Sequence, residues 1–310
     1  MKPPRIIALV GATATGKSAL GEALAERVEG EVVCADSRQV FRELEIGTGK
    51  PDPRERAARP HHLFDALSLA EGSSLASAGW YARTASATCA AIAARGRVAV
   101  LVGGSGLYLR AARLGLAATP PAVPAIRQRL RAEALALGPE ALHRRLAGID
   151  AVAAARLDPR DAQRITRALE VWEASGKPLT WWHERPLEGA VRGEWHGIEL
   201  VVPPAALRTR IVARTAWMFE NGLIEETRAL IARGLAEPLG RLRAVGYDEA
   251  MECTAGRLTR AEAETRTSQR TAQLAKRQRT WFRKQWEGTR IEAEGVPLPA
   301  LLESTLRALA

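Results

Sequence analysis

An apolar pentapeptide that runs into a glycine-rich loop limits the fold of this chain more than any other feature. Ile6–Val10 is followed at once by Gly11–Leu20, which reads GATATGKSAL and contains the pattern Gly-x-x-x-x-Gly-Lys-Ser. In this pattern a buried strand enters a loop whose backbone N–H groups cradle phosphates, and a helix follows. The lysine adds a mobile charge, and the serine hydroxyl is placed to bind Mg²⁺. We therefore expect a phosphorylated ligand on this loop, whose residues are Gly11, Ala12, Thr13, Ala14, Thr15, Gly16, Lys17 and Ser18.

The order of apolar runs predicts an α/β fold. Two further short runs, Glu31–Cys34 and Val98–Val102, alternate with the helix-like segments Ser18–Val28 and Leu75–Ala94. Alternation of this kind is typical of a parallel sheet flanked by helices, as in P-loop NTPase-like proteins. The carboxyl ends of such strands form the binding site. The segments that follow the three strands, and that we expect to meet there, are Gly11–Ser18, Ala35–Gln39 and Gly103–Gly106.

Changes in composition divide the chain into three parts. A proline-rich stretch after Leu114 leads into helical periodicity, and glycines and prolines break that periodicity before residue 190. We expect residues 1–115 to form the first part of the core and residues 116–190 to form a helical insertion domain. Residues 191–310 are expected to complete the core with a strand at Ile198–Val202 and to end in basic helices.

The charge of the chain favours a polyanionic partner. The formal net charge is +10, and the segment Arg257–Arg290 alone holds ten cations against three carboxylates. On a helix, Lys276, Arg279 and Arg283 fall on one side, with tryptophans interleaved. A generally arginine-rich composition or a solvated basic face would also explain these charges. The sharper interpretation is an RNA or DNA backbone bound along this segment.

Cysteine usage and hydropathy bear on location. The three cysteines are widely spaced and form no C-x-x-C pair, so neither a disulfide framework nor a zinc site is predicted. Reduced thiols favour the cytoplasm. The first strand begins almost at once, which leaves no room for a signal peptide, and no apolar run approaches the ~18 residues of a membrane span. We expect a cytoplasmic monomer with no membrane contact.

The position of one carboxylate narrows the chemistry. An ordinary ATPase carries an aspartate after a later strand, where it helps to hold Mg²⁺, but here Val98–Val102 runs into Gly-Gly-Ser-Gly. The carboxylate follows the second strand instead, as Asp36. There it suits a general base acting on a hydroxyl or an amine, or a capping residue. This pattern argues against a motor-type NTPase and leaves small-molecule kinases and other pyrophosphate chemistry open.

Two weaker segments offer further phosphate donors. Thr48 and Lys50 lie in the glycine-rich turn EIGTGKP, although a plain turn would explain the glycines equally well. Arg210 and Arg214 are four residues apart on a helical segment, so both would point toward a pyrophosphate if that face met the site. Ordinary surface arginines are the alternative.

Taken together, these segments resemble the bacterial tRNA dimethylallyltransferases, also called tRNA isopentenyltransferases. The resemblance implies a P-loop-like core with an insertion domain that binds tRNA. It also implies transfer of a dimethylallyl group from dimethylallyl diphosphate to the exocyclic N6 amine of the adenosine 3′-adjacent to the anticodon, with release of diphosphate. The landmarks span nearly the whole chain in the family's order: GATATGKSAL, ADSRQVFRELEIGTGKP, RPHHLFDAL, LVGGSGLYLRA, DPRDAQRITRALEV, ENGLIEE, LRAVGYDEA and QLAKRQRTWFRK.

The same resemblance implies a role for individual residues. The loop and Arg214 would hold the diphosphate, with Mg²⁺ at Ser18; Asp36 would take the amine proton; and Lys17 and Arg214 complete the catalytic set. Asp248 and Ala272 stand where the family commonly has cations, which puts single RNA contacts in doubt. The residues expected to contact tRNA are Asp36, Ser37, Arg38, Gln39, Ser105, Arg127, Gln163, Arg164, Arg167, Arg243, Gly246, Tyr247, Lys276, Arg277, Arg279 and Arg283.

Other functions share part of this evidence. A small-molecule P-loop kinase, or a prenyltransferase acting on free adenine nucleotides, would use the loop and Asp36 without needing the basic segment. A non-catalytic RNA-binding switch would bind a nucleoside triphosphate and would tolerate the loss of Asp36. Within the loop, the hydroxyls of Thr13 and Thr15 would reach either the diphosphate or the incoming base.

Overall fold

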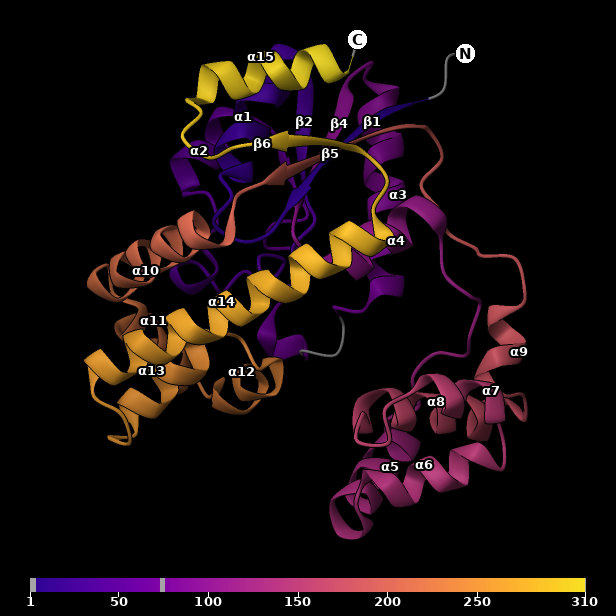
Figure 1. The fold of residues 1–310 in the computed structure, drawn as a ribbon. Coiled ribbons are helices and arrows are strands. Elements are labelled where there is room, and N and C mark those ends of the chain that lie inside the picture. Colours follow the sequence, from indigo (N-terminus) through magenta and orange to yellow (C-terminus); the bar gives the residue numbers. More distant parts are fainter. Residues whose placement is uncertain (1–3, 73–75, 310) are drawn as a thin grey trace. The chain divides into compact units, whose positions relative to one another are not determined.

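The computed structural model describes residues 4–72 and 76–309 (Figure 1). These residues form two compact units. The larger unit combines Met1–Arg113 with Ala190–Ala310, and the smaller one is Leu114–Gly189. The expected helix at Leu75–Ala94 appears as α3 (Ala78–Ala94), while Leu75 itself lies outside the described residues.

The larger unit is built on a parallel sheet that has six strands within the described residues, in the order β3-β2-β4-β1-β5-β6. This confirms the predicted α/β class. The apolar runs predicted as strands became the four central strands, whereas the two edge strands are short and were not predicted because they carry no apolar run. The strands are β1 (Arg5–Gly11), β2 (Gly30–Cys34), β3 (His61–His62), β4 (Val98–Gly103), β5 (Glu194–Val201) and β6 (Thr289–Glu292).

Both faces of the sheet are covered by helices. Along β1 the side chains of Ile6, Ala8 and Val10 point to one face, where α3 and α4 (Gly106–Leu114) pack. Ile7 and Leu9 point to the opposite face, against α1 (Lys17–Arg27) and α15 (Leu298–Ala308). All five side chains are fully buried. Burial on both sides explains why the central strands read as continuous apolar runs rather than as alternating ones.

A group of helices follows β5 and surrounds the carboxyl end of the sheet. The longest is α14 (Arg260–Gln285), the long gold helix of Figure 1, which packs against α10 and α13. Thr259 and Glu262 form a capping box at its first turn, so the basic segment begins as a stable helix. The other members are α10 (Pro204–Glu220), α11 (Leu223–Ala232), α12 (Ala236–Leu242) and α13 (Tyr247–Thr254).

Between β2 and α3, the described residues contain two 3-10 turns and one short helix besides the edge strand β3. The turns are η1 (Ile46–Thr48) and η2 (Leu69–Glu71), and the helix is α2 (Pro53–Ala58). Asp52 caps α2, whose first residue is a proline. Because η1 follows directly on the segment after β2, it brings Thr48 to the carboxyl edge of the sheet.

The smaller unit is entirely helical and has an apolar core of its own. That core gathers Leu130, Leu142, Leu146, Ile165 and Leu169, residues at the helical spacing seen in the sequence. A bridge between Leu116 and Glu188 joins the two ends of the unit. Its helices are α5 (Pro124–Leu137), α6 (Pro139–Ala147), α7 (Ala151–Arg156), α8 (Ala162–Ser175) and α9 (Leu179–His183).

Of the helices in the described part of the chain, none combines the length and apolar character that a bilayer crossing demands. Cys34 and Cys89 are buried, Cys253 is half-buried, and all three are free thiols.

Candidate active site

The loop between β1 and α1 has the shape needed to present backbone N–H groups to an anion. Ala14 and Gly16 adopt left-handed backbone conformations, with φ values of 64° and 94°. Thr15 is only 2% exposed, and its hydroxyl donates to the carbonyl of Ala12 at 2.9 Å. The ammonium group of Lys17 donates to the same carbonyl at 3.1 Å. The loop is therefore closed from within by Thr15, which answers one question from the sequence: the Thr15 hydroxyl is engaged inside the loop.

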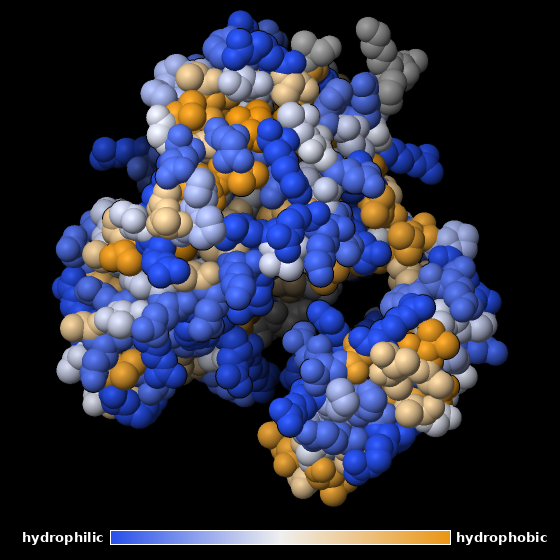
Figure 2. Space-filling view, in the orientation of Figure 1, coloured by the Kyte–Doolittle hydropathy of each residue, from blue (hydrophilic) through white to orange (hydrophobic). Residues whose placement is uncertain are grey.

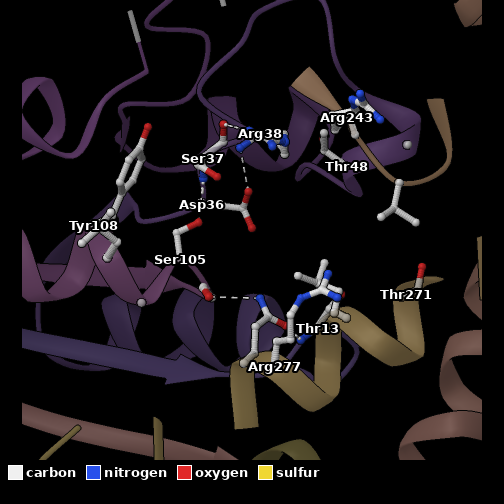
Figure 3. A pocket seen from close by; sticks show the side chains of 18 of the residues that line it. Thr13, Asp36, Ser37, Arg38, Thr48, Ser105, Tyr108, Arg243, Thr271 and Arg277 are labelled. Carbon is white, nitrogen blue, oxygen red and sulfur yellow. Dashed lines mark hydrogen bonds between the residues drawn. The ribbon is translucent and has the colours of Figure 1, made fainter. Parts of the chain in front are cut away.

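Asp36 stands at the end of β2 and points into a cavity (Figure 3). Its Oδ1 atom accepts a hydrogen bond from the backbone N–H of Arg38 at 2.8 Å, which closes a tight turn. The N–H of Ser37 donates to Ser105 Oγ at 2.9 Å, so the ends of β2 and β4 are joined. Among the described residues no donor lies within hydrogen-bond distance of Asp36 Oδ2. Asp36 thus caps its own turn with one oxygen and keeps the other for a ligand.

Arg214, on α10, spans the mouth of the loop. Its Nη1 atom donates to the hydroxyl of Thr13 at 3.0 Å, and its Nη2 atom donates to the carbonyl of Thr48 at 2.9 Å. Arg210 lies elsewhere: it donates to the carbonyls of Thr15 and Ala293 and lines neither of the cavities beside Asp36. Of the two arginines expected to point toward a pyrophosphate, only Arg214 lines these cavities.

Two cavities meet at this point. The larger, of about 660 Å³, is bounded by the ends of β2 and β4 and by α10 and α14. The smaller, of about 50 Å³, lies on the side of the loop and includes Ser18, Gln39 and Gly49 in its wall. Five residues line both cavities and so form the junction between them: Thr13, Lys17, Asp36, Thr48 and Arg214.

The junction concentrates positive charge away from water. Burial lowers the pKa of Lys17 to about 8; Asp36 opposes this shift and Arg214 adds to it. Burial also lowers the pKa of the Arg214 guanidinium, and Asp36 again opposes the shift. One carboxylate thus faces two desolvated cations, an arrangement that an additional anion would stabilise.

Helix α14 presents two different faces. One face lines the larger cavity with Leu274, Arg277, Gln278 and Trp281. The ring of Trp281 lies against Gly106, where an added Cβ atom would come within 2.4 Å of it. The opposite face lines a separate groove of about 650 Å³, together with Thr15 and Arg208, and contributes Lys276, Arg279 and Arg283. The three cations predicted to share one side of the helix do so, on the side away from Asp36.

Ion pairing separates the cations of the basic segment into two groups. Arg257, Arg260, Arg270 and Arg290 are each paired with a carboxylate. Between residues 276 and 284, by contrast, no cation has a carboxylate of the described chain within 4.0 Å. These unpaired cations are Lys276, Arg277, Arg279, Arg283 and Lys284, and the surface over α14 in Figure 2 is mainly hydrophilic. Unpaired positive charge is therefore concentrated in the second half of the helix, with exposed Arg266 as a further unpaired cation in the described first half.

Other residues that were expected near this site make hydrogen bonds that fix the walls of the cavities. Arg38 donates to the carbonyl of Leu242 at 2.7 Å, and Gln39 donates to the carbonyls of Thr48 and Gly49. Tyr247 lines the larger cavity, but its hydroxyl donates to half-buried Glu226 and accepts from the N–H of Gly47. Arg243 and Gly246 adopt left-handed conformations next to it, and Arg243 lines the cavity as well.

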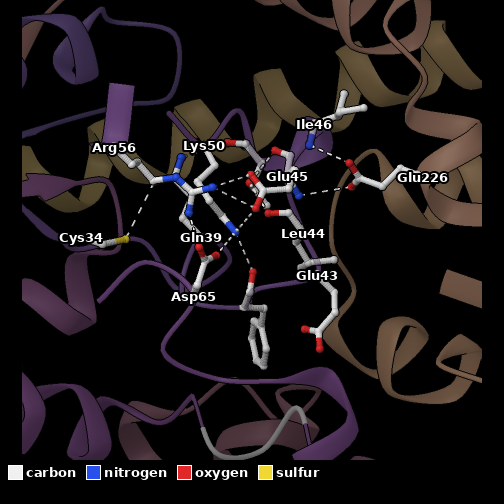
Figure 4. Close-up of polar contacts among 12 residues, drawn as sticks. Cys34, Gln39, Glu43, Leu44, Glu45, Ile46, Lys50, Arg56, Asp65 and Glu226 are labelled. Carbon is white, nitrogen blue, oxygen red and sulfur yellow. Dashed lines mark hydrogen bonds and ion pairs between the residues drawn. The ribbon is translucent and has the colours of Figure 1, made fainter. Parts of the chain in front are cut away.

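Lys50 does not serve as a phosphate donor. Its side chain is buried and bonds to the carbonyl of Phe41 at 2.9 Å, to Glu45 at 3.2 Å and to Asp65 at 2.6 Å (Figure 4). Arg56 pairs with the same two carboxylates. Lys50 and Arg56 thus fix the turn from inside. Thr48 lines the junction, but its hydroxyl donates to the carbonyls of Leu44 and Glu45, both at 3.0 Å.

In the smaller unit, two of the expected RNA-binding arginines converge on one carboxylate. Glu170 is fully buried and accepts from Arg127 at 2.7 Å and from Arg167 at 3.0 Å. These bonds lower the pKa of Glu170 against the effect of its burial, which is the largest influence and raises it. Gln163 and Arg164 lie exposed on the first turn of α8. Arg127 and Arg167 are therefore part of the framework of this unit as well as of its surface.

Comparison with known proteins identifies this arrangement. A family profile described as IPP transferase matches residues 39–285, most of the chain. The chain belongs to the IPP transferase family. A tRNA dimethylallyltransferase of Myxococcus xanthus is 45% identical over 282 residues, covering 91% of this chain and 90% of that protein. A tRNA dimethylallyltransferase of Salinispora tropica is 45% identical over 295 residues, covering 95% and 90%.

Solved structures agree. The tRNA isopentenylpyrophosphate transferase of Bacillus halodurans matches with a TM-score of 0.70 and 32% identity, covering 98% of this chain and 95% of that one. A eukaryotic dimethylallyltransferase acting on tRNA shares the fold, with a TM-score of 0.78 at 22% identity and coverage of 94% and 74%. Membership of this family identifies the chain as a prenyl-transferring enzyme rather than a kinase.

Asp248, where the resemblance led us to expect a cation, forms an ion pair within the protein. Its carboxylate pairs with Arg270 at 2.8 Å, and Arg270 also binds Glu249. Burial is the largest influence on the pKa of Asp248 and raises it, although Arg270 lowers it in part. The carboxylate of Asp248 thus forms an ion pair that joins α13 to α14.

The donor set at the loop suits a magnesium ion that comes with its phosphates. Ser18 and Asp36 both line the smaller cavity. No group of three or more acidic, histidine or cysteine side chains that could hold a metal ion occurs in residues 4–72 and 76–309. Mg²⁺ commonly keeps several waters and takes only one or two ligands from the protein, the rest from substrate phosphates. These residues therefore fit a shared ion better than a resident one.

Two contributors to the site were missed by the sequence analysis. The first is Gln278, whose amide contacts both the phosphate loop and the end of β4. Gln278 is spaced four residues from Leu274 and from Phe282. The signal in the sequence was therefore a polar side chain at an inward-facing position of this helix. The second is Glu226, which binds the N–H groups of Glu45 and Ile46 and so holds η1 in place. Because Glu226 lies far from Glu45 and Ile46 in the sequence, no local pattern indicated that contact.

Proposed function

We propose that this chain transfers a dimethylallyl group from dimethylallyl diphosphate to the exocyclic N6 amine of the adenosine 3′-adjacent to the anticodon in tRNA, releasing diphosphate. Family membership and the names of the relatives support this function. The structural observation that carries it is the junction at which a phosphate loop, two desolvated cations and one open carboxylate face the same space.

The junction suits the charge changes of this reaction. The bond between the allylic carbon and the diphosphate oxygen breaks, so negative charge grows on the departing diphosphate. Lys17, Arg214 and the loop N–H groups are already in place to stabilise that charge. The N6 amine forms the new C–N bond and loses a proton, which we assign to Asp36 Oδ2. Thr13 accepts from Arg214, so its own hydrogen remains available for the diphosphate.

The larger cavity has the size and lining for the adenine base and the prenyl tail. An adenine in an RNA loop must leave its stack to reach a carboxylate, which requires a pocket with polar walls and aromatic surfaces. Ser105 and Trp281 supply such groups, while Ile211, Met218 and Leu274 offer an apolar wall to the prenyl tail. Mg²⁺, held by Ser18 with the diphosphate, would supply additional charge neutralisation.

RNA contacts are proposed in both units. In the larger unit the unpaired cations between residues 276 and 284 and the exposed Arg243 would bind backbone phosphates. In the smaller unit Arg164, Gln163 and the outward-facing sides of Arg127 and Arg167 would do the same. Each unit therefore has its own basic surface toward the tRNA.

A transfer assay tests the proposal. Purified protein with Mg²⁺ and labelled dimethylallyl diphosphate is offered unmodified tRNA or AMP, and we expect label on tRNA. An Asp36→Asn variant should lose turnover by at least about 100-fold while tRNA affinity changes little, because general-base catalysis contributes roughly 10²–10⁴-fold. Label on AMP alone would support the free-nucleotide alternative. Equal losses of binding and rate in Asp36→Asn would assign Asp36 to positioning.

A further inference from the structure

The side chain of Gln278 bridges two segments that lie far from it in sequence. Its Oε1 atom accepts a hydrogen bond from the backbone N–H of Thr13 at 2.9 Å. Its Nε2 atom donates to the carbonyl of Gly104 at 3.0 Å. One amide on α14 thus holds both the start of the phosphate loop and the loop after β4, where Ser105 follows.

The side-chain amide of Gln278 is closely packed against Gly104, which limits its possible orientations. A Cβ atom at Gly104 would lie 2.5 Å from Gln278 Nε2, so the glycine makes room for the contact. The two ends of the amide are also not interchangeable, since Oε1 faces an N–H donor and Nε2 faces a carbonyl acceptor. A flip of the amide would lose both hydrogen bonds.

The bridge ends on the residue at the centre of the junction. Thr13 is fixed twice: its N–H by Gln278, and its hydroxyl by Arg214 at 3.0 Å. Without the first contact, the backbone of Thr13 would be free to turn, and its hydroxyl and the Arg214 guanidinium would lose their alignment with the diphosphate. Misplacement of reacting groups by about 1 Å can cost on the order of 100-fold in rate.

We propose that Gln278 is a positioning residue for prenyl transfer, which aligns Thr13 and the loop after β4 with the reacting atoms. This inference rests on the proposed function. It assigns Gln278 a task different from that of its neighbours Lys276 and Arg279, whose side chains face the opposite groove. Gln278 therefore acts on the rate of the chemical step rather than on tRNA affinity.

The test is a Gln278→Met variant, which keeps the length of the side chain and removes both polar contacts. We expect kcat to fall by about 10- to 100-fold while the Kd for tRNA, measured by filter binding, and the slope of that Kd against salt stay within twofold of wild type. A higher tRNA Kd with unchanged kcat would make Gln278 an RNA contact and overturn the inference. An unchanged kcat and Kd would overturn it too.

A second variant keeps the inference testable if Gln278→Met does not fold. Gly104→Ala leaves Gln278 in place but pushes its amide away, so the same fall in kcat is expected. Because both changes break one bridge, the double variant should be no slower than the worse single variant; additive losses would contradict a shared bridge. If wild-type protein transfers no label to tRNA, the proposed function fails, which is a different outcome from an active wild type with an equally active Gln278→Met.

Discussion

Lys17 shows how the site is prepared for its ligand at the scale of one residue. The ammonium group is held beside Arg214 in a desolvated position, and only Asp36 compensates. Because of this burial, the pKa of Lys17 is lowered from an ordinary 10.5 to about 8. The same burial strengthens the attraction of Lys17 for a phosphate, because little water competes. In the proposed function, a bound diphosphate would therefore compensate the buried charge of Lys17.

Proton uptake on diphosphate binding follows from this shift. Near pH 8.5 much of Lys17 is neutral in the free protein, and a bound diphosphate raises its pKa, so binding takes up protons. We expect Mg²⁺-diphosphate titrated into wild type at pH 8.5 to take up up to about one proton more than into Lys17→Met, measured by calorimetry in buffers of different ionisation enthalpy. Equal uptake by the two proteins would contradict the shift.

The sign of the effect on stability can also be worked out. Since the unfolded chain binds the Lys17 proton up to pH 10.5 and the folded protein only up to about pH 8, unfolding takes up a proton within that window. The contribution of Lys17 to the free energy of unfolding therefore rises as the pH increases from about 8 to 10.5.

At the scale of elements, α14 combines two tasks on its two faces. Leu274, Gln278 and Phe282 face the cavity at a spacing of four residues. Lys276, Arg279 and Arg283 follow the same period on the other side. Periodicity in the sequence predicted that these cations would share a side. It did not predict which side faced Asp36, because that depends on how α14 packs on α10 and α13.

The unpaired face of α14 makes a prediction about salt. Replacing Lys276 and Arg283 with glutamine should weaken tRNA binding and lower the slope of log K against log salt by about 1.4 to 1.8, since each phosphate contact contributes roughly 0.7–0.9. The measurement is filter binding of tRNA over a salt series.

A matched control removes the same charge from cations that are already paired. Arg241 and Arg257 are themselves exposed and each binds a glutamate, so replacing both with glutamine should leave the slope nearly unchanged. If the two double variants lowered the slope equally, net charge rather than the α14 face would govern RNA binding.

At the scale of the whole molecule, the sequence predicted what local patterns encode and missed what distant segments make together. The buried strands and the phosphate loop were readable because hydropathy and glycine spacing are local. The edge strand β6 and the differing fates of Arg210 and Arg214 were not, since both depend on tertiary packing. Lys50 was considered as a phosphate donor, but it is paired with Glu45 and Asp65. This arrangement also depends on tertiary packing.

The position of the modified base tests the account most directly. Two anticodon stem-loops are compared, one with adenosine 3′-adjacent to the anticodon and one with guanosine there, each incubated with protein, Mg²⁺ and dimethylallyl diphosphate. Nuclease digestion and mass spectrometry then locate the prenyl group. We predict a dimethylallyl group on N6 of that adenosine and none on the guanosine stem-loop. Prenylation of other adenosines, or equal transfer to both stem-loops, would contradict the account.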